Sequence, residues 1–260
     1  MHNSMHSNYI HFIKNFDIFN RDNPLLVCLH GNSSCAETFS TIMNQIDNKI
    51  QLIAIDLPGC GKSLRLQNYT MHSVGKIISE FIASFNPSLL YIFGHSLGGH
   101  LIAFLTNKID GIILSGTPPL SGMSDFSSAF TPCPSALELL PLLSQQSPFS
   151  ESEAHKFISH TGVTGDLLEL MINNAMLADG NFRKGCLSTL ADIDQRKIIE
   201  SSRNVVIFHA RQDGVINPDY LETINKECLF QNKIHYLDGK HMTPIFNASE
   251  IISIIESLIL

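Results

Sequence analysis

The chain contains the stretch Leu89-Leu90-Tyr91-Ile92-Phe93-Gly94-His95-Ser96-Leu97-Gly98-Gly99. It begins with an apolar run typical of a buried strand, and a helical pattern opens at Gly98. Its centre matches the pattern G-x-S-x-G, in which a serine occupies a sharp turn from strand to helix. The glycines give the tight turn room, and the turn exposes the hydroxyl at the positive end of a helix. We therefore predict that Ser96 is a nucleophile.

Other strands and helices flank this stretch in alternation. Further apolar runs of strand length cover 25–30, 52–55, 111–114, 205–208 and 234–237, and amphipathic helical patterns cover 74–85 and 251–259. Apolar runs that alternate with helices predict an α/β fold with a mostly parallel central sheet and helices on both faces. The opening segment, 9–19, alternates loosely and predicts a β-hairpin leading into the sheet.

Residues 118–203 have a different pattern. They begin with a loop rich in proline and continue with helical patterns over 137–143, 153–158 and 167–176, without a convincing strand. We predict that residues 118–203 form a helical cap inserted into a core made of residues 1–117 and 204–260.

A serine nucleophile needs a base and a carboxylate that orients the base. His241 follows a late strand and precedes the last helix, and Asp213 follows the strand at 205–208. Both then lie at the same edge of a parallel sheet as Ser96, in the chain order Ser, Asp, His that is typical of this architecture. We predict that His241 is the general base and Asp213 its partner. Asp219, after Pro218, is the weaker alternative, because it suits the start of a helix.

The oxyanion of the reaction needs two preorganised donors. The backbone N–H of Leu97 follows the serine, and Asn32 follows the first long strand in His30-Gly31-Asn32-Ser33-Ser34. We predict that the N–H groups of Leu97 and Asn32 form the oxyanion hole, with the Asn32 side chain also reaching the substrate. The alternative is that the Asn-Ser-Ser segment caps a helix over 36–43.

One glycine-rich segment imitates a phosphate-binding loop. Gly61-Lys62-Ser63 resembles the end of a P-loop, but position 56, where that loop requires its first glycine, is aspartate. We interpret the segment as a structural turn.

Composition excludes several classes of function. The formal net charge is −7, which argues against a nucleic-acid partner, and no apolar stretch has the ~18 residues of a membrane span. The six cysteines are scattered without a C-x-x-C pair, and the N-terminus lacks the pattern of a secretory signal. We expect a cytoplasmic protein that acts on a small molecule, without metal or cofactor.

Together the motifs resemble the α/β-hydrolase superfamily over nearly the whole chain. A narrower set, which includes 30–34, 56–59, 96–100 and 116–119, resembles the serine-dependent N-acyl-homoserine lactonases. That resemblance implies attack of Ser96 on a lactone carbonyl, Asn32 near the reacting oxygen, and an acyl chain beneath the cap. Apolar cap residues would line the acyl tunnel: Leu139, Leu140, Leu143, Leu167, Leu168 and Met171. Those lactonases carry a cap tyrosine near the substrate, where this chain has Phe157.

The sequence leaves several functions open. The first is hydrolysis of an ester or a lactone through an acyl-enzyme on Ser96. A general carboxylesterase, an acyltransferase and a C–C bond hydrolase could use the same scaffold, and a hydrolase-derived binding protein is the non-enzymatic alternative.

Overall fold

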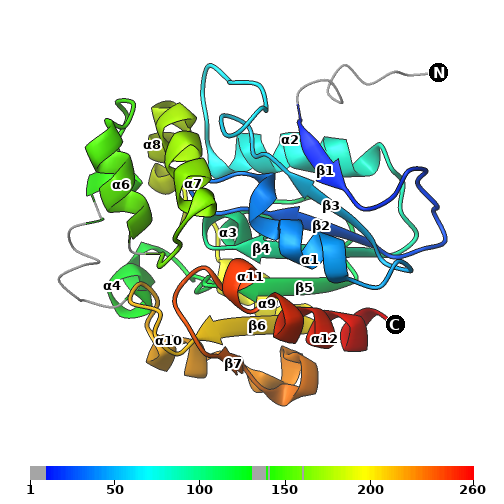
Figure 1. Ribbon diagram of the computed structural model, residues 1–260. Coiled ribbons are helices and arrows are strands. Elements are labelled where there is room, and N and C mark those ends of the chain that lie inside the picture. Colours follow the sequence, from blue (N-terminus) through cyan, green and yellow to red (C-terminus); the bar gives the residue numbers. More distant parts are fainter. Residues whose placement is uncertain (1–9, 131–138, 140, 160) are drawn as a thin grey trace.

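The computed structural model describes residues 10–130, 139, 141–159 and 161–260, and its centre is a sheet of seven strands (Figure 1). The strands are β1 (Phe12–Lys14), β2 (Leu25–Leu29), β3 (Gln51–Ile55), β4 (Leu90–His95), β5 (Gly111–Ser115), β6 (Val205–Ala210) and β7 (His235–Leu237). Their order is β1-β3-β2-β4-β5-β6-β7, and every neighbouring pair is parallel except β1 with β3. The predicted α/β architecture with a mostly parallel sheet is confirmed.

The predicted hairpin at the start of the chain is wrong. Within the described residues of 9–19 there is one strand, β1, and it pairs antiparallel with β3, with Phe12 opposite Ile55. The Asn15 side chain continues this pairing, since its Oδ1 accepts from Leu52 N–H at 2.7 Å. An alternating pattern marks a strand but not its partner, and the open edge of β3 supplies the partner here.

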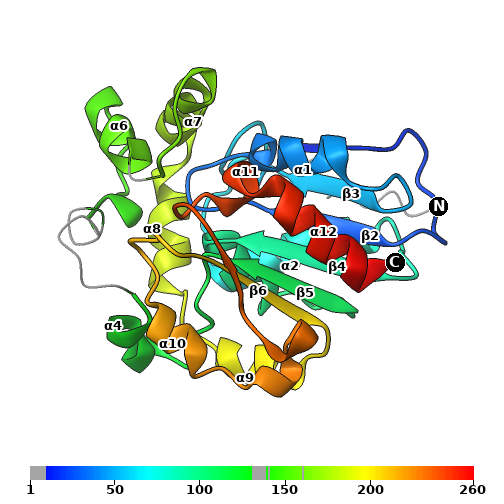
Figure 2. The same cartoon turned by 60° about the horizontal axis from the view of Figure 1, so that its bottom comes forward.

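Helices cover both faces of the sheet because its strands are apolar on both sides. Along β2, Leu25, Val27 and Leu29 enter one buried cluster, whereas Leu26 and Cys28 enter another. The first cluster packs under α2 (Met71–Ala83) and α3 (Leu97–Ile102). The second packs under α1 (Ser40–Gln45) and α12 (Ala248–Ile259), which lie together on the opposite face (Figure 2). This arrangement explains why the strands read as continuous apolar runs.

The segment between β5 and β6 is helical in its described residues. It contains α4 (Phe126–Ala129), α6 (Glu151–Ser159), α7 (Asp166–Leu177), α8 (Gly180–Ser188) and α9 (Gln195–Ser201). The predicted helices at 153–158 and 167–176 lie inside α6 and α7. The helix predicted over 137–143 lies partly on residues outside the described set. Its described residues, Leu139 and 141–143, are helical. The domain boundaries at 118 and 203 stay a prediction.

The helices α6 and α7 stand beyond one end of the sheet (Figures 1 and 2). They enclose a separate apolar cluster that includes Phe149, Ile158 and Met171, and this cluster also takes in Met242 from the loop after β7. The polar loops that follow β4, β6 and β7 therefore lie beneath this apolar cluster, which we call the roof.

The remaining short helices are α10 (Pro218–Glu222), α11 (Thr243–Phe246) and 3₁₀ turns at Ala36–Phe39, Met123–Asp125, Lys226–Cys228 and Phe230–Asn232. None of the helices in the described part of the chain has the length and apolar character needed to cross a membrane.

Candidate active site

Ser96 occupies a turn that the backbone adopts only under constraint. It links β4 to α3 with φ 52° and ψ −121°, a conformation that is rare for residues other than glycine. Its N–H donates to Ser115 O at 2.8 Å, and Thr117 Oγ1 donates to Ser96 O at 2.9 Å. These two hydrogen bonds, to residues at and just after the end of β5, hold Ser96 in its strained conformation.

The glycines around Ser96 are required by close backbone approach. A Cβ atom on Gly98 would lie 2.2 Å from Leu29 O, and one on Gly94 would lie 2.4 Å from Gly99 Cα. The helix α3 thus begins directly against the end of β2, which leaves no space for a side chain at these positions.

Asp213 and His241 are brought together from the ends of β6 and β7. His241 Nδ1 lies 2.8 Å from Asp213 Oδ2, while Asp213 Oδ1 accepts from the N–H groups of Val215 at 2.8 Å and Ile216 at 3.2 Å. Three contacts thus orient the carboxylate. Asp219, the alternative carboxylate, lies in the first turn of α10 after the N-cap residue Asn217, as a helix-start residue would.

The two groups shift each other's pKa in opposite directions. Burial alone would raise the pKa of Asp213, but the charge and hydrogen bond of His241 lower it below its ordinary value. Burial alone would lower the pKa of His241, but the Asp213 charge and hydrogen bond raise it. The pair favours an ionised carboxylate that stabilises an imidazolium, which is what a general base requires after it takes a proton.

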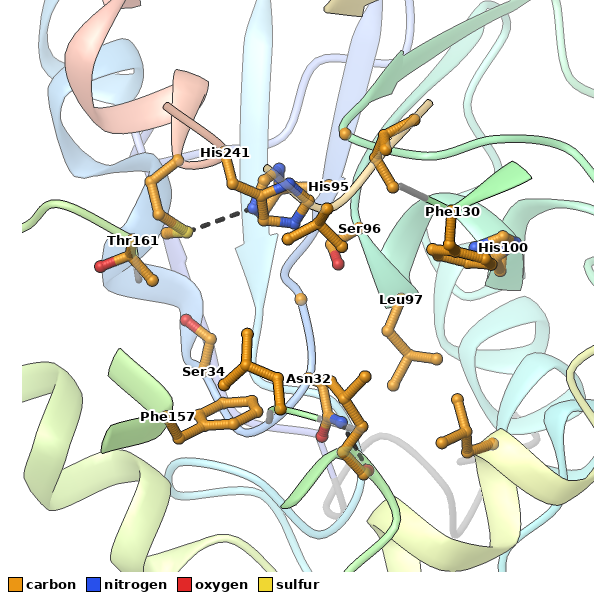
Figure 3. A pocket seen from close by; sticks show the side chains of 18 of the residues that line it. Asn32, Ser34, His95, Ser96, Leu97, His100, Phe130, Phe157, Thr161 and His241 are labelled. Carbon is orange, nitrogen blue, oxygen red and sulfur yellow. Dashed lines mark hydrogen bonds between the residues drawn. The ribbon is translucent and has the colours of Figure 1, made fainter. Parts of the chain in front are cut away.

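Ser96 and His241 line the same cavity, and Figure 3 shows the Ser96 hydroxyl directed into it. Gly116, with φ 58°, makes room for the imidazole, because a Cβ atom there would lie 2.7 Å from His241 Cε1. No hydrogen bond joins Ser96 Oγ to His241 among the described residues. Such bonds often form only when substrate is bound, so the geometry remains compatible with proton transfer.

Two backbone donors near Ser96 lack partners in the described part of the chain: the N–H groups of Leu97 and Asn32. The loop that carries Asn32 approaches the serine closely, since a Cβ atom on Gly31 would lie 3.2 Å from Ser96 Cβ. Both predicted donors therefore lie near the nucleophile.

The Asn32 side chain is engaged elsewhere. Its Nδ2 donates to Leu143 O of the predicted cap at 2.9 Å, and its Oδ1 accepts from Ser33 Oγ at 3.1 Å. The helix-capping alternative is not what the structure shows. The 3₁₀ turn that begins at Ala36 has no side-chain cap from this segment, and Ala36 N–H donates to Asp56 Oδ1 at 2.7 Å.

Asp56 fills the turn that imitates a phosphate-binding loop. Its Oδ2 accepts from Lys62 N–H at 2.8 Å and lies 2.8 Å from His11 Nδ1. A Cβ atom on Gly61 would lie 2.2 Å from this carboxylate. The negative charge of this buried aspartate would repel a phosphate, so the segment is a structural turn.

The cavity above Ser96 has a volume of about 340 Å³. Residues of the predicted cap contribute Leu143, Phe157 and Met171, and the core contributes Ile216 and Met242. Among its described lining residues there is no Lys, Arg, Asp or Glu. The cavity therefore suits an uncharged, largely apolar group.

Some of the residues predicted to line an acyl tunnel line this cavity. Leu139, Leu143 and Met171 line the cavity. Leu167 and Leu168 are partly buried and pack against the apolar cluster of α6 and α7, and Leu140 lies outside the described residues. Phe157 also lines it and packs against Phe149 at 5.3 Å between ring centroids.

Two histidines of the cavity wall were not singled out from the sequence. His95 lies beside His241, with 5.0 Å between ring centroids, and burial holds its pKa well below the ordinary value. His100 lies on α3. His95 lies inside the serine motif and His100 two residues after it, but their side-chain directions depend on the strand and helix that meet there. No group of three or more His, Cys, Asp or Glu side chains in the described ranges forms a metal site.

Comparisons with known proteins agree with this fold. The sequence model of the family described as the alpha/beta hydrolase fold matches residues 24–248. A solved structure of the N-acyl homoserine lactonase AidH with N-butanoyl homoserine superposes with a TM-score of 0.83 at 23% identity, covering 96% of this chain and 92% of that one. An esterase from Exiguobacterium antarcticum superposes with a TM-score of 0.77 at 17% identity, covering 96% and 95%.

Curated relatives match shorter segments. The protein PHYLLO of Arabidopsis thaliana is 27% identical over 128 residues, which cover 43% of this chain and 7% of the relative. Among the first such relatives the matched share of their own length ranges from 7% to 29%.

Proposed function

From the premise that this chain belongs to the alpha/beta hydrolase fold family, we propose that it is a serine hydrolase of carboxylic esters or lactones. The observation that carries the proposal is the convergence on one cavity of the strained Ser96, the His241–Asp213 pair at 2.8 Å and two unpartnered backbone N–H groups. These are the parts that acyl transfer through a serine requires.

The proposed mechanism has two halves. His241 takes the proton of Ser96 as Oγ attacks the carbonyl carbon, and the N–H groups of Leu97 and Asn32 stabilise the oxyanion. The imidazolium then protonates the leaving alcohol, and an acyl-enzyme remains on Ser96. A water molecule activated by His241 releases the acid and restores the serine.

Lactones with an acyl chain are the proposed substrate class. The superposition with an N-acyl homoserine lactonase extends over almost the whole chain, and the uncharged cavity suits an acyl chain. The phenyl ring of Phe157 offers no hydroxyl to the substrate, and the nearby Thr161 hydroxyl donates instead to Ile158 O at 2.6 Å.

A general carboxylesterase is the second candidate, because an esterase shares the fold at a TM-score of 0.77. The acyltransferase, the C–C bond hydrolase and the non-catalytic binding protein remain alternatives that product analysis and multiple turnover distinguish.

We retain the cytoplasm as the proposed location. The five described cysteines, Cys28, Cys35, Cys60, Cys186 and Cys228, are all free thiols, as is usual in a reducing compartment.

The test compares ring opening of N-acyl-homoserine lactones with cleavage of a p-nitrophenyl ester, followed by proton release and by chromophore. Ser96→Ala should reduce turnover on either substrate by at least ~10³-fold. Ser34→Ala is the matched control, because Ser34 lines the same cavity but its hydroxyl bonds Thr38 at 2.8 Å, so this variant should keep most of its turnover. Equal activity of Ser96→Ala and the unmodified protein would refute the proposal. Ester cleavage without lactone opening would leave only the carboxylesterase.

A further inference from the structure

His100 is a buried polar residue of the cavity that the mechanism above does not use. It lies one helical turn after Ser96 on α3, and its N–H donates to Ser96 O at 3.4 Å. It is only 5% exposed, yet it lines the cavity on the side where Phe130 also lies (Figure 3). His100 and Ser96 therefore line the same cavity and belong to the same turn of chain, at the start of α3.

One edge of the His100 ring is already bonded. Its Nδ1 lies 2.7 Å from Oε1 of the buried Gln195 in α9, whose amide nitrogen donates to Leu190 O. Since the Gln195 amide nitrogen is the donor to that carbonyl, its oxygen accepts, and Nδ1 must carry the hydrogen. The proton of a neutral ring is then on Nδ1, and Nε2 carries a lone pair.

The ring stays neutral in the working range of most enzymes. Burial lowers the pKa of His100 to about 4, although the Gln195 hydrogen bond opposes this shift. Nε2 is therefore an acceptor and cannot act as a cation toward an anionic ligand.

Three other polar side chains of the cavity wall have partners within the protein. The Asn32 amide donates to Leu143 O, the Ser34 hydroxyl bonds Thr38, and the Thr161 hydroxyl donates to Ile158 O. His100 Nε2, in contrast, has no partner among the described residues. The His100 ring lines the cavity, whereas Gln195, which bonds its Nδ1, does not. An acceptor at the cavity wall that has no partner among the described residues can pair with a ligand that supplies a donor.

We propose that His100 Nε2 accepts a hydrogen bond from a donor on the carbon next to the carbonyl that Ser96 attacks. The matching substrates are α-acylamino esters and lactones, whose amide N–H stands at that carbon. The inference rests on the proposed hydrolase function and makes His100 a specificity-determining residue of the same site.

The test uses two matched substrate pairs. The first pair is N-hexanoyl-homoserine lactone and its N-methyl derivative, and the second is the p-nitrophenyl ester of N-acetylglycine and that of N-acetylsarcosine. In each pair only the amide N–H is replaced. We expect the ratio of kcat/KM within a pair to fall about tenfold in His100→Phe, which corresponds to one net hydrogen bond. His100→Gln, which keeps an acceptor, should recover part of the ratio.

His235→Phe is the matched control. His235 is a buried histidine of β7 that packs against Phe208 and does not line the cavity, so its replacement should leave the ratio unchanged. If His100→Phe keeps the ratio of the unmodified protein, the inference is refuted while the hydrolase function stands. If no substrate is cleaved by the unmodified protein, the proposed function itself fails.

A second measurement does not require His100→Phe to fold. In the Ser96→Ala protein, the ¹⁵N resonance of His100 Nε2 should shift on binding N-hexanoyl-homoserine lactone and shift less with the N-methyl derivative. Equal shifts with both ligands would refute the inference.

Discussion

His241 depends on Asp213 for both its protonation and its orientation. The 2.8 Å contact favours the imidazole proton on Nδ1, which leaves Nε2 as the acceptor in the proposed proton transfer from Ser96. Because Asp213 raises the pKa of His241, the neutral imidazole that acts as a base is lost as the pH falls through a value above the ordinary one of about 6.5.

Replacing Asp213 by Asn therefore changes both the rate and its pH dependence. Burial then acts on His241 without the opposing charge, so the pKa should fall and the acidic limb of kcat/KM should move to lower pH. The wrong tautomer should also reduce kcat by roughly 10³–10⁴-fold. A pH–rate profile of each protein measures both effects. Asp219→Asn is the control, and an acidic limb that moves in that variant instead would assign the role to Asp219.

Gly98 is a residue at which any side chain meets backbone. A methyl group there would lie 2.2 Å from Leu29 O and 2.6 Å from His30 O, neither of which can rotate away. We expect Gly98→Ala to lower the free energy of unfolding by about 1–3 kcal/mol, or a Tm drop of roughly 2–12 °C. Gly122→Ala is the control, since a Cβ atom there meets nothing within 4 Å. Calorimetry showing equal Tm values for the two variants would contradict this expectation.

At the scale of elements, a buried arginine joins α8 to the segment that covers the cavity. Arg183 donates to the carbonyl oxygens of Gln145 at 2.9 Å, Ser147 at 2.8 Å and Ala178 at 3.2 Å, and to Ser33 Oγ at 3.3 Å. Its guanidinium also lies 3.9 Å from the centre of the Phe149 ring. Ser33 in turn donates to Asn32, so this side chain ties the covering segment to the loop that carries a proposed oxyanion donor.

Arg183→Met should keep the packing volume but leave several carbonyl groups without a donor. We expect a loss of about 3 kcal/mol in the free energy of unfolding, and a lower kcat if the Asn32 loop shifts. Denaturant unfolding and initial rates measure the two effects. Lys184→Met is the control on the same helix, because the exposed Lys184 ammonium bonds the Gln146 side chain at 2.9 Å and no other group in the described ranges. Equal stability of the two variants would show that Arg183 has no anchoring role.

The elements differ in how far local pattern predicts them. Apolar runs and helical spacing predict the strands β2 to β6 and the helices α2 and α12. Each of these elements buries its own apolar side chains against a neighbouring layer, so its local sequence records the pattern. The partner of β1 does not follow, since an edge strand pairs with whichever open edge the finished sheet presents. The role of Arg183 could not be predicted from the sequence either. Its acceptors are mostly backbone carbonyl groups of other segments, and every residue type has a backbone carbonyl group.

At the scale of the whole molecule, the cavity lies between the sheet and the predicted cap. Met171 of α7 is buried and lines it, whereas its neighbour Leu170 is 38% exposed and does not. If the proposed acyl substrate binds here, we expect this roof to limit the length of its chain.

A larger side chain in this roof should shorten the preferred acyl chain. With Met171→Trp, kcat/KM for a p-nitrophenyl octanoate should fall about tenfold more than for the acetate, because only the longer chain meets the indole. Leu170→Trp adds the same bulk outside the cavity and should leave this ratio unchanged. The two chain-length profiles, measured side by side, would contradict the expectation if they coincide.

Local sequence was sufficient for the strand–serine–helix turn, because the close approach of α3 to β2 admits only glycine at Gly98 and this requirement appears directly in the residue pattern. The same logic identified Asp213 and His241 as candidates, since loops after parallel strands meet at one edge of a sheet. Contacts across the fold decided the rest. The neutral acceptor at His100 exists only because Gln195 of a distant helix bonds one edge of its ring, and the anchoring of the cavity roof depends on Arg183 reaching three separate carbonyl groups. Such interactions join groups that are far apart in the chain, so no local pattern records them.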